Sequence, residues 1–162
     1  GPGYDPFLTP DTAPAGVRLV ERDALLTTSD VVSLHVPLNA QTRGMIAEAE
    51  LRAMKTNAVL INTSRGGLID EDALVRVMTA GHLAGAGLDV TETEPLPADH
   101  PLRGLDRVIL TPHILGHTID LYTVMPDVLV ENATRIMKGG LPTYVRNPDV
   151  VERWRQKLND LN

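Results

Sequence analysis

Three side chains with acid–base or anion-binding chemistry each follow a segment that reads as a strand. Arg65 follows the apolar run Ala58–Ile61, and Glu94 and His113 hold comparable positions downstream. Because open α/β sheets bind ligands beyond the carboxyl ends of their strands, these side chains can share one site. An arginine binds a carboxylate through two hydrogen bonds. A histidine paired with a carboxylate is suited to proton transfer.

The elements that must position these side chains alternate between strands and helices. We expect strands at residues 17–20, 30–36, 57–62, 84–90 and 107–110, and helices at residues 21–29, 47–54, 70–81 and 118–138. This alternation is typical of an α/β fold with a parallel sheet. Asp70 is the expected N-cap of the third helix and Gly81 its end. Pro126 should kink the last helix or mark its true start.

Composition excludes several classes of function. The 162 residues are 43% hydrophobic and 22% charged, with a net charge of −6, so nucleic acid and anionic membranes are not expected partners. No apolar run approaches the roughly 18 residues of a membrane span. The absence of cysteine excludes disulfides and thiolate metal sites and fits a cytoplasmic protein. The histidines form no metal-ligand pattern, so no metal site is predicted.

Five segments, taken in order, resemble the D-isomer-specific 2-hydroxyacid dehydrogenases. They are Tyr4-Asp5-Pro6, Leu34–Leu38, Asn62–Gly66, Gly87–Val90 with Glu94-Pro95, and Thr111–Ile114. The resemblance implies a doubly wound parallel sheet of the Rossmann type. It also implies two parts: an incomplete dinucleotide-binding domain at residues 3–117, and a C-terminal helix and tail at residues 118–162 that return to a substrate domain.

A dinucleotide-binding fold normally carries a Gly-x-Gly-x-x-Gly turn after its first strand. The printed sequence contains no such turn, since Gly85-Ala86-Gly87 lies inside an expected strand. We therefore expect the first strand and its glycine turn to be missing from this sequence. That strand is central in the usual order, so its absence would expose two sheet edges.

The resemblance assigns roles to individual residues. Arg65 would anchor the carboxylate of a small 2-keto acid, and His113 with Glu94 would act as acid and base at C2. The cofactor would be NAD, with Asp5 favouring it over NADP because a carboxylate repels the 2′-phosphate. The implied cofactor-binding residues are Asp5, His35, Val36, Pro37, Thr42, Thr63, Ser64, Arg65, Asp89, His113 and Gly116. A homodimer is also implied.

Several alternatives remain open at the level of sequence. Glu92 competes with Glu94 for the carboxylate role, although the proline after Glu94 favours the latter. His117 could face the substrate or cap a helix. Leu115 and His117 replace small residues common in the family, and Thr91 stands where an aromatic is common. The usual substrates of the family therefore cannot be assumed.

Two other functions compete with that of a dehydrogenase. Some relatives of this fold are transcriptional corepressors that use NAD to stabilise an assembly, and they can retain the three catalytic residues. The chain could also be an inactive fragment, because the pyrophosphate site would be absent. Turnover of a 2-keto acid with NADH would separate the enzyme from a corepressor.

Overall fold

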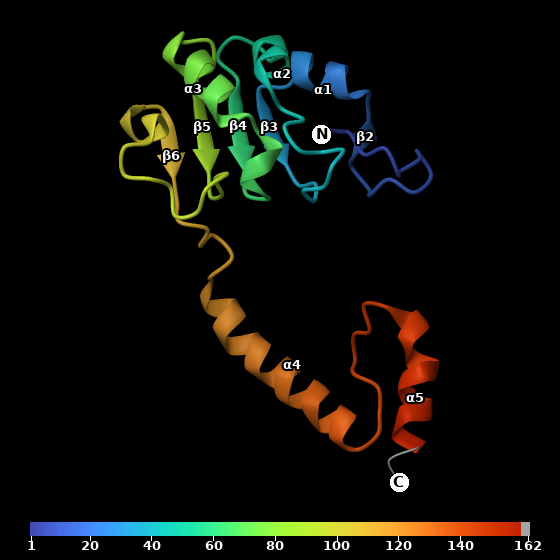
Figure 1. Ribbon diagram of the computed structural model, residues 1–162. Coiled ribbons are helices and arrows are strands. Elements are labelled where there is room, and N and C mark those ends of the chain that lie inside the picture. The colour runs from blue at the N-terminus through green and yellow to red at the C-terminus, as the bar shows by residue number, and fades with distance from the viewer. Residues whose placement is uncertain (160–162) are drawn as a thin grey trace. The chain divides into compact units, whose positions relative to one another are not determined.

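The computed structural model describes residues 1–159, which divide into two compact units. The first unit is Gly1–Leu115, and the second begins at Gly116. The first contains all the strands (Figure 1), and the second contains helices only. Each unit is considered by itself below.

The main sheet of the first unit has four parallel strands. They are β3 (Val31–Leu34), β4 (Val59–Asn62), β5 (Gly85–Leu88) and β6 (Val108–Leu110), side by side in that order (Figure 1). All four lie within segments that the sequence assigns to strands. The parallel α/β arrangement is confirmed.

A second, two-stranded sheet forms near the N-terminus. β1 (Pro2–Gly3) pairs in parallel with β2 (Arg18–Leu19). Among the described residues, no strand pairs with the other edge of β1 or with the outer edge of β3. A groove of about 620 Å³ lies between these edges, lined by both strands and by α1 (Arg22–Thr28). The sheet is therefore interrupted between β1 and β3, as expected when the first strand of a dinucleotide-binding fold is missing.

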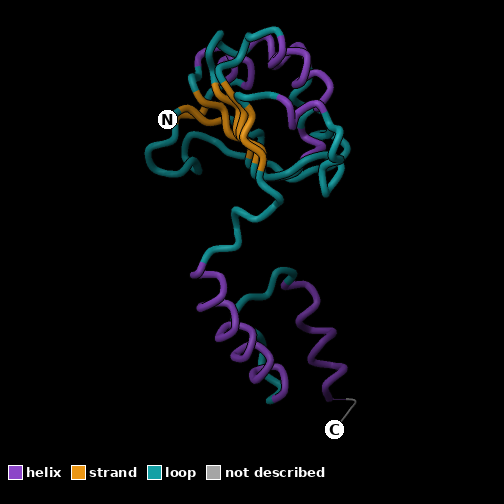
Figure 2. The backbone as a smooth tube through the Cα atoms, turned by 90° about the vertical axis from the view of Figure 1, so that its left-hand side faces the viewer, coloured by secondary structure: helices purple, strands orange, loops and turns teal. Residues whose placement is uncertain are grey.

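The core lies between the main sheet and the helices α1, α2 (Glu48–Ala53) and α3 (Glu71–Thr79), which Figure 2 shows beside the strands. Alternate strand residues face this core: Val32, Leu34, Leu60, Asn62, Ala86 and Leu88 are all buried. The other face is open, since Val31 is 59% and Ile109 72% exposed. Helices of this unit thus cover one face of the sheet.

Helix α3 forms as its sequence predicts. The Asp70 side chain accepts a hydrogen bond from the Ala73 amide at 2.9 Å, which satisfies a free donor at the helix N-terminus. Leu74 and Val77 are buried on the core side. Gly81 ends the turn with φ +76°, a conformation that glycine adopts without steric cost.

The second unit contains α4 (Ile119–Met137), the 3-10 turn η3 (Pro148–Val150) and α5 (Val151–Asn159). Thr118 precedes α4, and Pro126 lies inside it, so the helix does not begin at the proline. Gly139 follows the helix with φ +74°. No helix in the part of the chain described is long and apolar enough to span a membrane.

Candidate active site

The residues singled out in the sequence follow strand ends. Asp5 lies just beyond β1, His35, Val36 and Pro37 beyond β3, Thr63, Ser64 and Arg65 beyond β4, Asp89 and Glu94 beyond β5, and His113 beyond β6. Because the strands of the main sheet are parallel, the residues that follow β3 to β6 all lie at the carboxyl-terminal end of the sheet.

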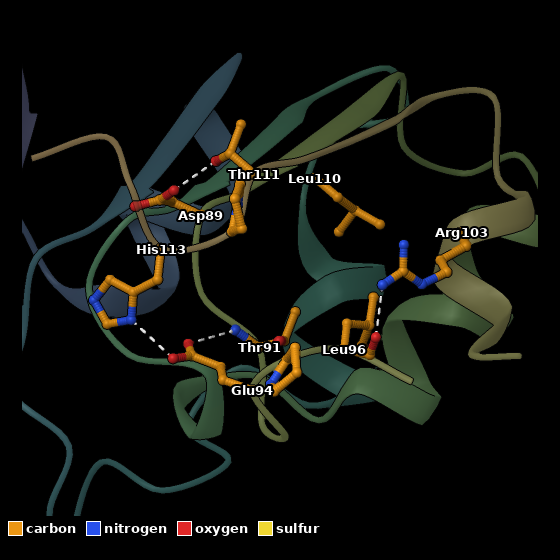
Figure 3. A pocket seen from close by; sticks show the side chains of 10 residues that line it. Asp89, Thr91, Glu94, Leu96, Arg103, Leu110, Thr111 and His113 are labelled. Atoms are coloured by element: carbon orange, nitrogen blue, oxygen red, sulfur yellow. Dashed lines mark hydrogen bonds and ion pairs between the residues drawn. The ribbon is translucent and has the colours of Figure 1, made fainter. Parts of the chain in front are cut away.

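His113 and Glu94 form a pair at this end of the sheet (Figure 3). The Nδ1 atom of His113 lies 2.8 Å from Oε2 of Glu94, and Oε1 of Glu94 accepts a hydrogen bond from the Thr91 amide at 3.2 Å. The hydrogen bond with His113 lowers the pKa of Glu94, and the Thr91 amide and the positive charge of Arg65 add to this effect. Both side chains are partly exposed, so the pair is accessible to a small ligand.

The carboxylate that contacts His113 is Glu94 and not Glu92. Glu92 lies instead 3.8 Å from the Arg43 guanidinium. The two carboxylates are close in sequence, and the loop directs Glu94 toward the imidazole (Figure 3).

Asp89 holds the loop that carries His113. Its Oδ1 accepts hydrogen bonds from the Thr111 hydroxyl at 2.6 Å and the Ile114 amide at 2.9 Å, and its Oδ2 accepts one from the Leu115 amide at 3.2 Å. Burial alone would raise the pKa of Asp89, but these hydrogen bonds outweigh it and lower the pKa. The Asp89 carbonyl also accepts the His113 amide at 2.8 Å. Asp89 is therefore a structural anchor of the loop.

His113 itself has a left-handed backbone, with φ +54°. A histidine in this conformation is held there by its surroundings, and such residues concentrate at functional sites. The hydrogen bonds from the His113 amide to the Asp89 carbonyl and from the Ile114 amide to the Asp89 carboxylate supply that hold.

The turn that presents Arg65 depends on the buried side chain of Asn62. Its Nδ2 donates to the Arg65 carbonyl at 2.9 Å, and its Oδ1 accepts from the Ser64 amide at 3.1 Å. The Ser64 hydroxyl donates to the Val36 carbonyl at 2.7 Å, which ties this turn to the end of β3. The Arg65 guanidinium donates to the Ser64 carbonyl at 2.6 Å and remains exposed.

Arg65, Glu94 and His113 line one cavity of about 350 Å³, together with Gly66 and Gly67. Glu94 and His113 also line a second, more apolar cavity of about 580 Å³ (Figure 3). Leu96, Leu110 and Arg103 also line it. The walls of the first cavity carry a guanidinium and an imidazole, two groups that can bind a small anion.

The residues expected on the adenosine side of a dinucleotide do not line the two cavities beside the His113–Glu94 pair. Asp5 is exposed and accepts the Phe7 amide at 2.8 Å. His35 lies 2.8 Å from the Ser33 hydroxyl, and both His35 and Asp5 line the groove between β1 and β3. Thr42 donates from its hydroxyl to the Pro37 carbonyl at 2.7 Å.

Two further residues considered in the sequence, Gly116 and His117, lie in the second unit. Gly116 is the first residue of the second unit. His117 lies 3.2 Å from the Tyr122 hydroxyl through its Nδ1 atom, beside the start of α4. No cluster of three or more histidine, aspartate or glutamate side chains among residues 1–159 is arranged to hold a metal ion.

Three contributors to the site are absent from the predicted set: Asn62, Thr111 and Glu71. The sequence could have indicated Asn62, because it occupies a core-facing position at the end of a strand, where a polar side chain needs hydrogen-bond partners within the protein. Thr111 and Glu71 act through residues distant in sequence, Asp89 and Glu92, so no local pattern reveals them.

Comparison with known proteins places this chain in a family. The sequence profile of the D-isomer specific 2-hydroxyacid dehydrogenase NAD-binding domain matches residues 2–114. The chain belongs to this family. The resemblance inferred from the five sequence segments is thereby confirmed.

Individual relatives agree with this assignment. A glyoxylate reductase of Thermofilum pendens is 42% identical over 88% of the chain, which covers 42% of that protein. A D-3-phosphoglycerate dehydrogenase of Archaeoglobus fulgidus is 41% identical over 89% of the chain and is covered to 27%. The crystal structure of D-lactate dehydrogenase with NAD+ from Lactobacillus jensenii superposes on 90% of this chain and 48% of that one, with a TM-score of 0.80 and 28% identity. The chain thus spans less than half the length of these relatives.

Proposed function

We propose that this chain is the dinucleotide-binding part of an NAD-dependent dehydrogenase. The reaction is hydride transfer between NAD(H) and C2 of a small D-2-hydroxy acid or 2-keto acid. The observation that supports it is the exposed His113–Glu94 pair, which shares a cavity with the Arg65 guanidinium. A 2-keto acid needs a cation for its carboxylate and a proton for its carbonyl oxygen, and this cavity offers both.

Each side chain has a distinct task in this proposal. Arg65 binds the substrate carboxylate and places C2 near His113. Glu94 holds Nδ1 of His113, which leaves Nε2 to donate a proton to the carbonyl oxygen during reduction and to accept it during oxidation. NAD, when bound, supplies or accepts the hydride.

The residues of this chain fit parts of the cofactor. Asp5 and His35 lie in the groove between β1 and β3, where a carboxylate suits a ribose diol and disfavours a 2′-phosphate. Asp89 has only 4% of its surface exposed, so its contact with a nicotinamide carboxamide would use the little that is open. The printed sequence has no glycine turn for the pyrophosphate. We expect the chain alone to bind NAD weakly unless another polypeptide segment fills the groove.

This expectation is tested by titrating the purified chain with NADH. A submicromolar affinity would overturn it. The intact mass of the sample under denaturing conditions decides what is being titrated. A single species near 17.6 kDa means the chain alone, whereas a second polypeptide would allow a complete sheet.

The catalytic assignment is tested in the complete dehydrogenase with a panel of 2-keto acids and NADH. We expect His113→Ala to reduce turnover by at least about 100-fold, in the range of a lost general acid. Arg65→Ala should mainly raise KM for the keto acid and also lower kcat. Arg18→Ala, which removes an exposed arginine on β2, is the control and should keep both constants. Near-normal turnover of His113→Ala would refute the acid–base role.

The same assay separates the dehydrogenase from an NAD-sensing corepressor of this fold. A corepressor would bind the cofactor and turn over slowly on every keto acid of the panel. The exposed dyad beside Arg65 favours the enzyme.

We also propose that the protein is cytoplasmic and acts as a homodimer. The absence of cysteine supports a reducing compartment. The dimer follows from family membership and is tested by light scattering of the complete protein.

A further inference from the structure

The loop that carries Glu94 is held by a buried carboxylate. Glu71, the first residue of α3, is 8% exposed, and its Oε1 accepts a hydrogen bond from the Glu92 amide at 2.5 Å. Its Oε2 lies 3.5 Å from Nε2 of His100. Glutamate is almost never this buried without partners, and Glu71 has one on each oxygen.

Short links connect Glu71 to the catalytic pair. The Glu92 amide that Glu71 holds is adjacent in sequence to Thr91, whose amide donates to Oε1 of Glu94. The Thr91 hydroxyl closes the loop by donating to the Thr93 carbonyl at 2.9 Å. The other Glu94 oxygen contacts His113 at 2.8 Å. Displacement of the Glu92 amide would therefore shift the carboxylate that orients the imidazole.

We propose that Glu71 is a positioning residue that fixes the Thr91–Glu94 loop and so keeps Glu94 against His113, with His100 as its second partner. The catalytic meaning of this role rests on the proposed function of the His113–Glu94 pair. Glu71 itself lies outside the sets of residues that line the two cavities beside that pair.

The groups around Glu71 make its hold dependent on pH. Burial raises the pKa of Glu71, whereas the Glu92 amide and the facing His100 lower it, and the Glu92 and Asp72 carboxylates raise it further. Glu71 therefore takes up its proton at a higher pH than an exposed glutamate. Because a charged acceptor forms the stronger hydrogen bond, the hold on the Glu92 amide weakens as the pH falls through that range.

The first test observes the wild-type chain by NMR while the pH is lowered. We expect the amide proton of Glu92 to shift with an apparent pKa above the ordinary 4.5 of glutamate. In Glu71→Gln this component of the titration should disappear, since the amide side chain still accepts a hydrogen bond but does not ionise. A Glu92 amide that titrates identically in both proteins would overturn the proposal. This test requires no substrate or cofactor.

The second test compares three variants. In Glu71→Ala we expect amide exchange at Glu92 to accelerate at least tenfold and the depressed pKa of Glu94 to return toward 4.5. Glu71→Gln should restore most of both properties. Asp72→Ala, which removes the neighbouring exposed carboxylate, is the matched control and should change neither. Should Glu71→Ala fail to fold, the titration of wild type and Glu71→Gln still decides the matter.

A kinetic comparison in the complete enzyme separates this proposal from the proposed function. We expect Glu71→Ala to lower kcat at least tenfold with little change in KM for the keto acid, because Arg65 is untouched. Glu71→Gln should recover most of kcat at neutral pH. If His113→Ala kept full activity while the NMR results held, the proposed function would fail and the positioning role of Glu71 on the loop would stand.

Discussion

Replacing Gly66 with alanine should displace the loop that carries Glu94. Gly66 begins the 3-10 turn η1 (Gly66–Leu68), directly after Arg65. A Cβ atom on Gly66 would overlap the Thr91 carbonyl group and the Glu92 nitrogen. Its distances to these atoms would be shorter, by roughly 1 Å or more, than the 3.4 Å at which ordinary contact begins. Since the obstructing atoms are backbone, no side-chain rotation relieves the overlap.

The size of the effect follows from this geometry. Overpacking of a tight site costs typically about 1–3 kcal/mol, and backbone against backbone belongs at the upper end. With a urea m value of about 2 kcal/mol/M, a loss of about 3 kcal/mol lowers the unfolding midpoint by about 1.5 M. In the complete enzyme, a shift of about 1 Å in the catalytic group is expected to cost on the order of 100-fold in kcat.

Gly67→Ala is the matched control for this prediction. A Cβ atom there would meet the ends of two flexible side chains, Arg43 at 3.0 Å and Leu38 at 3.1 Å, which can move aside. We expect its unfolding midpoint to change by less than half as much as that of Gly66→Ala. Equal midpoints for the two variants, or an unchanged Glu94 pKa in Gly66→Ala, would refute the argument that the two loops meet at Gly66.

The remaining predictions concern the hydrogen bonds that shape the site. Asp89→Ala leaves two amides and a hydroxyl without their acceptor, and at about 1 kcal/mol or more each the unfolding free energy should fall by about 3 kcal/mol in urea titrations. Because the folded pKa of Asp89 is depressed, its contribution is present above the ordinary value of 3.8 and lost as the pH falls through the folded value. The stability difference between wild type and Asp89→Ala should therefore shrink in acid, and a constant difference from pH 6 to pH 2 would contradict this account. Asn62→Ala should lower the unfolding free energy by about 2 kcal/mol, since it leaves the buried turn before Arg65 without its side-chain partners.

The order and type of the elements could be predicted because each depends on local periodicity. Apolar residues at helical spacing and an aspartate N-cap identify α3, and short runs of apolar or small residues identify the strands of the main sheet. Pro126 shows where such reasoning left two outcomes open, a kink within the helix or its true start, and α4 runs through the proline. Proline is tolerated in the first turn of a helix and also occurs in helix interiors, where it removes one backbone hydrogen bond, and the sequence pattern alone does not distinguish the two positions.

The site was predictable as a set of residue types at strand ends, but not as a set of contacts. Arg65, Glu94 and His113 were found because motifs carry them. The proline after Glu94 already favoured it over Glu92, but the contact with His113 depends on the path of the loop. That path runs against Gly66 and Glu71, both distant in sequence from the loop. Close backbone approach and long-range hydrogen bonds leave no local pattern, so they appear only in the folded chain.

The proposed acid–base pair and the proposed cofactor groove differ in how complete they are within this chain. Glu94, His113 and Arg65 all follow strands of the uninterrupted sheet β4–β5–β6, and every hydrogen bond that orients Glu94 against His113 lies within the first unit. Asp5 and His35, by contrast, both line the groove and follow β1 and β3, two strands that do not pair. A strand that filled that groove and hydrogen-bonded to both edges would join β1 and β3 in one sheet. The geometry of the acid–base pair can therefore be measured on this chain alone, whereas a cofactor affinity measured on it reports on the open groove.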